Sequence, residues 1–125
     1  IMDHDGNVKF LDEGGLFLGI IEEGTYESAK AKLDYGDVLV LETDGVTDIH
    51  NEEGSPFGSE RLHTLIKENH HRSAEEIRNA IYHACVEHRG EADQFDDFTL
   101  IVIKRLHPDS ILDSQDSFFE EIDLD

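Results

Sequence analysis

The chain has 125 residues, a length that suits one domain with one modest core and excludes two full domains. Its 30 Asp and Glu outnumber its 10 Lys and Arg, so the formal net charge is −20. Because phosphate groups are bound by an excess of positive charge, we expect neither nucleic acid nor an anionic membrane surface as a partner, whereas divalent cations suit so acidic a chain.

The first third of the sequence has the pattern of strands separated by turns. Asp5-Gly6-Asn7 predicts a turn before a strand at residues 8–11, and residues 26–33 predict a second strand. Asp3 and Asp5 also hint at a calcium loop, but the positions where such a loop needs Gly and Glu hold Val8 and Gly14. The sequence therefore favours a hairpin turn here.

A turn and a strongly apolar strand come next. Asp34-Tyr35-Gly36-Asp37 predicts the turn. The run Val38-Leu39-Val40-Leu41 has the length of a strand and no polar alternation, which predicts a strand buried on both faces. This strand would deliver Thr43-Asp44-Gly45 to its C-terminal end.

Two amphipathic helices are predicted after this strand. The first begins near Ser59 and places one apolar stripe at Leu62, Leu65 and Ile66. The second opens with the capping box Ser73-Ala74-Glu75-Glu76 and ends at Gly90. Its apolar stripe consists of Ile77, Ala80, Ile81, Ala84 and Cys85.

The last predicted strand is the apolar run 98–103, which Asp96-Asp97 directly precedes. We place a domain at residues 1–108 and an acidic tail at 109–125, because the tail holds seven acids and no base. The tail is either a mobile solvated end or a short partner-docking helix. In the second case its apolar side would be Ile111, Leu112, Phe118, Phe119, Ile122 and Leu124.

Cys85 is the single cysteine of the chain, which excludes an intramolecular disulfide, and it falls on an apolar stripe typical of a core residue. No stretch approaches the roughly 18 apolar residues of a membrane span. Both features favour a cytoplasmic protein. The histidine pairs His83/His88 and His70/His71 have poor spacing for a shared zinc ligand set.

Carboxylates border both apolar strands. Asp44 follows one strand and Asp96 precedes the other, so antiparallel pairing would bring them together at one edge of the sheet. Convergent carboxylates repel unless a cation or a proton compensates, and such oxygen ligands suit Mg²⁺ or Mn²⁺. Gly45 would allow close approach of a metal or phosphate. Spacing alone leaves open that Asp44-Gly45 is a plain turn and Asp96 a surface charge.

Three ordered motifs carry a resemblance to a known family. They are residues 33–48 (LDYGDVLVLETDGVTD), residues 57–62 (FGSERL) and residues 96–100 (DDFTL). Over about residues 5–105 the chain resembles the bacterial SpoIIE-like branch of the metal-dependent type 2C serine/threonine protein phosphatases. The resemblance implies an α+β fold, the αββα sandwich. It also implies a two-metal centre at one end of the sheets, where a metal-bound water attacks the phosphorus of phosphoserine or phosphothreonine.

The resemblance also implies site residues and partners. The aspartate of its TDG motif falls on Asp44 and the first aspartate of its DD-x-T motif on Asp96, both as ligands of one Mn²⁺ or Mg²⁺ ion. It implies no direct metal contact for Asp48 or Asp97. The implied substrate is a phosphorylated regulatory protein of the anti-sigma-factor-antagonist kind, and the implied controller is an upstream sensor or receiver domain.

The sequence departs from the family pattern at several places. It contains no early Asp-x-x-Gly-His-Gly segment, which in the family supplies the acid that bridges both metals. We therefore expect residues 1–108 to be the C-terminal part of the domain and to be inactive alone, with apolar strand faces left open to self-association. Glu42 stands where the family favours Tyr, and Leu16-Phe17-Leu18 where it favours Pro-Leu.

Two other functions fit parts of the sequence. A strand that ends in Glu42-Thr43-Asp44-Gly45 resembles the first motif of haloacid-dehalogenase-type phosphatases, but Glu42 takes the place of the nucleophilic Asp. A non-catalytic module that keeps the phosphatase scaffold for protein binding would also lack the bridging acid. The sequence upstream of Ile1 distinguishes this module from an enzyme.

Overall fold

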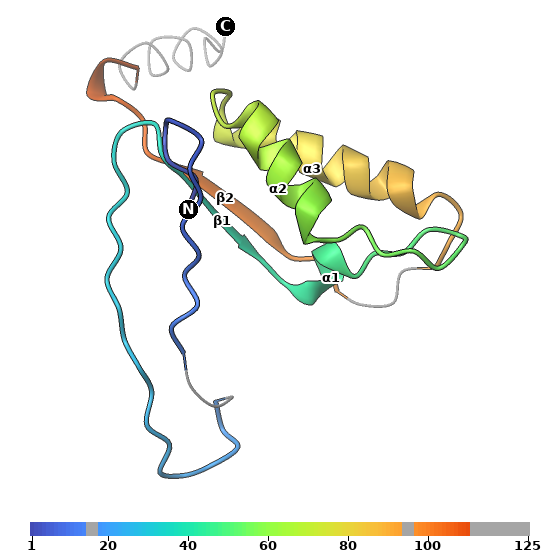
Figure 1. The fold of residues 1–125 in the computed structure, drawn as a ribbon, viewed down its shortest axis with the longest axis horizontal. Coiled ribbons are helices and arrows are strands. Elements are labelled where there is room, and N and C mark those ends of the chain that lie inside the picture. The colour runs from blue at the N-terminus through green and yellow to red at the C-terminus, as the bar shows by residue number, and fades with distance from the viewer. Residues whose placement is uncertain (15–17, 94–96, 111–125) are drawn as a thin grey trace, which may run out of the picture.

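The computed structural model describes residues 1–14, 18–93 and 97–110. In chain order the elements are β1 (Val38–Glu42), α1 (Asp44–Thr47), α2 (Ser59–Asn69), α3 (Ala74–Arg89) and β2 (Leu100–Lys104). The two strands pair antiparallel, and α2 and α3 lie on one face of the resulting sheet (Figure 1). This is an α+β arrangement of the expected class, with part of a layered sandwich.

The sheet has one covered and one open face. Val40 pairs with Val102, and both pack against the core under the helices. On the opposite face Leu39 pairs with Ile103 and Leu41 pairs with Ile101. Leu41, Ile101 and Ile103 are 46%, 48% and 45% exposed. The prediction that the first strand is buried on both faces was therefore wrong within the described residues, because side chains alternate and helices cover one face. The expectation of uncovered apolar strand faces is confirmed.

Both helices match their sequence signals. The Ser73 hydroxyl accepts from the backbone N–H of Glu76 at 3.1 Å, and the Glu76 carboxylate accepts from the N–H of Ser73 at 3.0 Å. This pair of bonds is the predicted capping box, and Gly90 ends α3 with a positive φ. The stripes meet in one core, built from Met2, Val38, Val46, Phe57, Leu62, Ile66, Ile77, Ile81 and Cys85.

The two strands predicted before residue 34 are not formed. Val8 makes an isolated bridge to Met2, which itself bridges to Val38 at the edge of β1. Residues 26–33 belong to a long excursion that runs away from the sheet and back (Figure 1). A strand needs a continuous neighbouring backbone edge for its hydrogen bonds, and in the described part of the chain this segment has a single bridge position, Tyr26, and no ladder. The predicted turn at 5–7 is confirmed, since the Asp3 carboxylate accepts from the N–H groups of Asp5 and Asn7.

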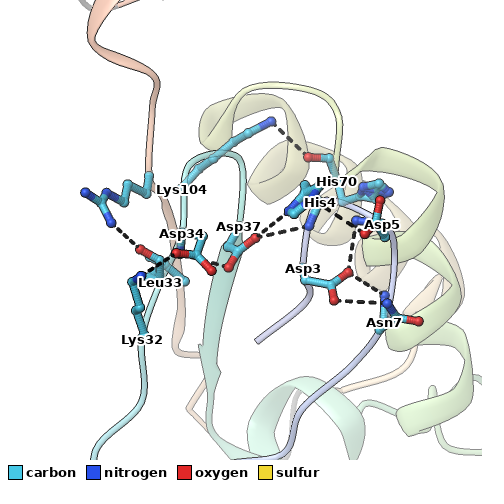
Figure 2. Close-up of polar contacts among 11 residues, drawn as sticks. Asp3, His4, Asp5, Asn7, Lys32, Leu33, Asp34, Asp37, His70 and Lys104 are labelled. Atoms are coloured by element: carbon cyan, nitrogen blue, oxygen red, sulfur yellow. Dashed lines mark hydrogen bonds and ion pairs between the residues drawn. The ribbon is translucent and has the colours of Figure 1, made fainter.

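Asp37 is a buried charge that fastens the N-terminal hairpin to β1. The residue is 4% exposed, and Figure 2 shows its carboxylate between two segments. One oxygen accepts from the backbone N–H of His4 at 3.1 Å and the other from the N–H of Asp34 at 2.9 Å. The His4 ring lies 3.4 Å away. The GD of residues 36–37 is therefore a structural clamp.

The pKa values of this clamp are shifted in opposite directions. Burial raises the pKa of Asp37, but the hydrogen bonds from Asp34 and His4 outweigh it and leave that pKa below its ordinary 3.8. The hydrogen bond between the His4 ring and the Asp37 carboxylate raises the pKa of His4 above 6.5, and the charge of Asp5 adds to this shift. The Asp37 contribution to stability is thus present above pH 3.8 and lost as the pH falls through its lowered pKa. The His4 contribution is present below pH 6.5 and lost as the pH rises through its raised pKa.

Replacing Asp37 by Ala should lower the free energy of unfolding by about 2 kcal/mol, because it leaves two partly buried N–H donors, those of His4 and Asp34, without an acceptor. Urea unfolding at neutral pH measures the change. Asp34→Ala is the matched control, since that carboxylate pairs with Lys32 at the surface and should cost at most about 1 kcal/mol. Equal losses for both variants would contradict the clamp.

Two further expectations concern the ends and the surroundings of the chain. Residues 111–125 lie outside the described residues, so the boundary near Pro108 and the docking helix of the tail stay predictions. In the part of the chain that the structure describes, no helix combines the length and apolar character that crossing a membrane requires.

Cys85 is confirmed as a core residue at 1% exposure. Burial raises the pKa of its thiol to about 11, and the charge of Glu42 makes a smaller contribution to that shift.

Candidate functional site

The candidate site lies where β1 ends. The chain passes from Glu42 through Thr43 into the one-turn helix α1, whose first residue is Asp44. Gly45 and Val46 are buried, and Val46 is fully enclosed by the core. Because the next two residues are anchored, the exposed side chain of Asp44 is held at the end of the sheet rather than in a free loop.

The Thr43 hydroxyl joins this turn to the segment that enters β2. It donates to the backbone carbonyl of Asp97 at 3.2 Å and accepts from the N–H of Thr99 at 3.2 Å. The backbone N–H of Thr43 also donates to the carbonyl of Thr99 at 3.2 Å. The strands do pair antiparallel, which was the condition for this convergence, and the TDG turn thus lies beside residues 97–99.

Gly45 is required by close packing against the same segment. A Cβ added to Gly45 would overlap the carbonyl oxygen of Asp97 and lie 2.6 Å from its carbonyl carbon. We expected this glycine to make room for a metal or phosphate, whereas in the structure the Asp97 backbone takes that room. Gly45 therefore sets the distance between the two acid-bearing segments.

The structure describes one of the two predicted metal ligands, Asp44. Asp44 is exposed at the start of α1, while Asp96 lies outside the described residues, so their convergence stays a prediction. Asp97 is exposed, and Asp48 ends α1 with its N–H on the carbonyl of Asp44 at 2.8 Å. Among the described residues no group of three or more His, Cys, Asp or Glu is arranged to hold a metal ion.

Glu42 is a residue whose role the sequence interpretation missed. It faces the covered side of the sheet, on the same side as Val38 and Val40, and the pKa of its carboxyl is raised. Burial is the main cause, and the negative charges of Asp44 and Asp48 add to it. The alternation of side chains along β1 was the signal that could have identified it. The acids Glu42, Asp44 and Asp48 at the end of β1 therefore repel one another.

The FGSERL motif holds the loop after α1 against the helices. Phe57 is 4% exposed, and its ring packs edge-on against the ring of His88, with 5.6 Å between the ring centroids. Arg61 donates to Nδ1 of His88 at 2.6 Å, and Nε2 of His88 lies 2.9 Å from the carbonyl of Ser55. These contacts give the motif a structural role. They also engage both ring nitrogens of His88.

Comparisons with known proteins identify the family. Residues 1–106 match the family described as Stage II sporulation protein E (SpoIIE). The chain is 37% identical over 101 residues to Phosphoserine phosphatase RsbU of Bacillus subtilis (strain 168). The matched region covers 81% of this chain and 30% of that protein. It is 30% identical over 105 residues to Protein IcfG of Synechocystis sp., which covers 84% of this chain and 16% of that protein.

A solved structure supports the same fold. The SiaA-PP2C domain of Pseudomonas aeruginosa matches with a TM-score of 0.59 and 26% identity, over 66% of this chain and 36% of that chain. This chain thus spans less than two fifths of each of these relatives. The family match replaces the haloacid-dehalogenase interpretation. The chain belongs to the Stage II sporulation protein E (SpoIIE) family and forms part of a type 2C protein phosphatase fold.

Proposed function

We propose that the chain supplies one side of the metal centre of a protein serine/threonine phosphatase, with Asp44 and Asp96 as ligands of Mn²⁺ or Mg²⁺. The observation that carries the proposal is the Thr43 hydroxyl, which bonds to Asp97 and Thr99 and so fastens the Asp44 turn to the segment next to Asp96. Carboxylate oxygens are the donors that these hard cations prefer.

The electrostatics of this end of the sheet support a cation. The pKa of Glu42 is raised in part by Asp44 and Asp48, so the described acids repel one another as they stand. A divalent cation would remove this cost. In the complete domain two ions would lower the pKa of the attacking water, screen the phosphate charge and hold the nucleophile in line.

Each residue of this chain then has a distinct task. Asp44 and Asp96 would hold the cation, Thr43 keeps their two segments in register, and Gly45 lets those segments approach. Glu42, Asp48 and Asp97 would add to the negative field without a ligand role. This sequence has no counterpart of the acid that bridges both metals in the family, so its residues would hold and position one ion without completing the centre.

The name of one relative bears on the substrate class of the complete domain. One relative is named a phosphoserine phosphatase, which supports phosphoserine as the group that is hydrolysed. We propose a phosphorylated regulatory protein of the anti-sigma-factor-antagonist kind as substrate and an upstream sensor or receiver domain as controller. Both would act on a protein that contains this chain within a complete domain.

The test is phosphate release by a protein that contains this chain within a complete domain. With Mn²⁺ or Mg²⁺ added, we expect phosphate release from a phosphoserine protein, and we expect a chelator to stop it. Failure to release phosphate from any phosphoserine protein or aryl phosphate with metal present would contradict the proposal. It would favour the non-catalytic binding module instead.

A further inference from the structure

A basic pocket lies at the end of the sheet opposite to Asp44. It is a cavity of about 450 Å³ between the C-terminal end of β2, the turn before β1 and the turn between α2 and α3. Three of the chain's 10 Lys and Arg line it, and none of its described lining residues is an acid. In a chain of net charge −20 this local excess of positive charge is a distinct surface feature.

Two of the three cations have no carboxylate partner in the described part of the chain. Lys104 donates from Nζ to the carbonyls of His70 at 2.9 Å and Arg72 at 2.6 Å, the first of which Figure 2 shows. Arg105 donates to the carbonyl of Leu33 at 2.7 Å and stacks over the Tyr35 ring at 4.2 Å. Carbonyl oxygens and rings orient these cations but do not neutralise them. Arg72, by contrast, pairs with Glu76 at 3.6 Å.

The partial burial of Lys104 makes an anionic partner more valuable. Burial lowers the pKa of its ammonium group, with the charge of Glu76 acting against that shift. A nearby anion would stabilise the charged form of this partly buried ammonium group, because its attraction offsets part of the cost of burial.

We propose that this basic pocket binds the acidic end of the chain itself, residues 111–125. Ser110 lines the pocket, so this segment starts at its rim. The 15 residues carry six acids and no base, which complements the pocket in charge. A tether of this length reaches at most about 50 Å and gives millimolar local concentrations, which lowers the affinity that the contacts themselves must supply.

The test uses the whole chain with a nitroxide on Ser117→Cys. Cys85 stays unlabelled because its thiol is buried and its pKa is about 11. We expect the nitroxide to broaden the amide resonances of His71, Ser73 and Arg105 at low salt. The effect should disappear near 1 M salt, where the Debye length is about 3 Å.

Two charge variants separate docking from general electrostatics. The tail variant carries amides at its six acids: Asp113→Asn, Asp116→Asn, Glu120→Gln, Glu121→Gln, Asp123→Asn and Asp125→Asn. The control carries the same number of amides at exposed acids elsewhere: Asp12→Asn, Glu13→Gln, Glu22→Gln, Glu23→Gln, Glu27→Gln and Glu53→Gln. The broadening should be lost in the tail variant and kept in the control.

Three results would overturn the proposal. One is equal broadening of the pocket in the tail variant and the parent chain. A second is broadening of the open sheet face at Leu39, Ile101 and Ile103 with no effect on the pocket. The third is broadening in a mixture of spin-labelled and isotope-labelled chains, since this would show binding to a second copy.

Discussion

Asp44→Asn, made in a protein that carries the complete phosphatase domain, should lower metal-dependent phosphate release by about 10²-fold or more and leave the fold intact. The change removes one anionic oxygen from the proposed ligand set, and even residues that merely orient ligands contribute about 10–100-fold. Asp96→Asn should have an effect of the same size, because both carboxylates are proposed to hold the same ion.

Stability should move little in the Asp44→Asn variant without metal. An acid in the first turn of a helix contributes about 0.3–1 kcal/mol through the helix dipole, but α1 has a single turn. Against this, the variant relieves the repulsion that contributes to the raised pKa of Glu42. We expect the two effects to cancel to within about 0.5 kcal/mol, or to favour the variant slightly.

Asp48→Asn is the matched control, since it removes one acid from the same end of β1 without removing a proposed ligand. Phosphate release at limiting Mn²⁺ and urea unfolding of the metal-free proteins measure both quantities. Near-normal turnover of Asp44→Asn or Asp96→Asn would show that the site is misplaced. Equal losses for Asp44→Asn and Asp48→Asn would reduce the role of Asp44 to general negative charge.

Gly45→Ala should be the most damaging single change at the site. Its Cβ would overlap the backbone of Asp97, which cannot move aside as the end of a flexible side chain can. Overpacking costs about 1–3 kcal/mol and each lost hydrogen bond about 1 kcal/mol, while the better helix propensity of Ala returns about 1 kcal/mol. The steric cost is the larger, so we expect a net loss of about 2–3 kcal/mol.

The same variant should reduce activity, because moving residues 97–99 displaces the neighbouring Asp96, and a shift of about 1 Å can cost about 10²-fold. Gly14→Ala is the control, since a Cβ there meets nothing within 4 Å. Urea unfolding and phosphate release measure both effects. A Gly45→Ala protein as stable and active as Gly14→Ala would contradict the close packing of the two segments.

Local signals explain why the helical half of the fold could be predicted. The capping box at Ser73 and Glu76 and the stop at Gly90 are encoded within a few residues, and the structure reproduces each. The strands before residue 34 failed for the opposite reason. Residues 26–33 have a strand-like sequence, but a strand also depends on a backbone edge that a distant part of the fold must supply.

The positions of the candidate ligands could be predicted from the sequence, but the hydrogen bonds that hold their segments together could not. Asp44 at the end of an apolar strand and Asp96 at the start of another indicate convergence once antiparallel pairing is assumed. The Thr43 hydroxyl gave no signal, because its partners Asp97 and Thr99 are more than 50 residues away. Asp37 read as a turn residue, since nothing local shows that it also accepts from His4.

Paramagnetic broadening by Mn²⁺ in the isotope-labelled 125-residue chain tests the central claim most directly. Two carboxylates form a weak site, so we expect a dissociation constant of about 10⁻³ M, no phosphatase turnover, and broadening that begins at the amides of Asp44, Gly45 and Asp97. Asp44→Asn should abolish this pattern. Broadening centred on the Asp3 turn or on residues 109–125, with Asp44 and Asp97 unaffected, would contradict a metal site at the end of β1.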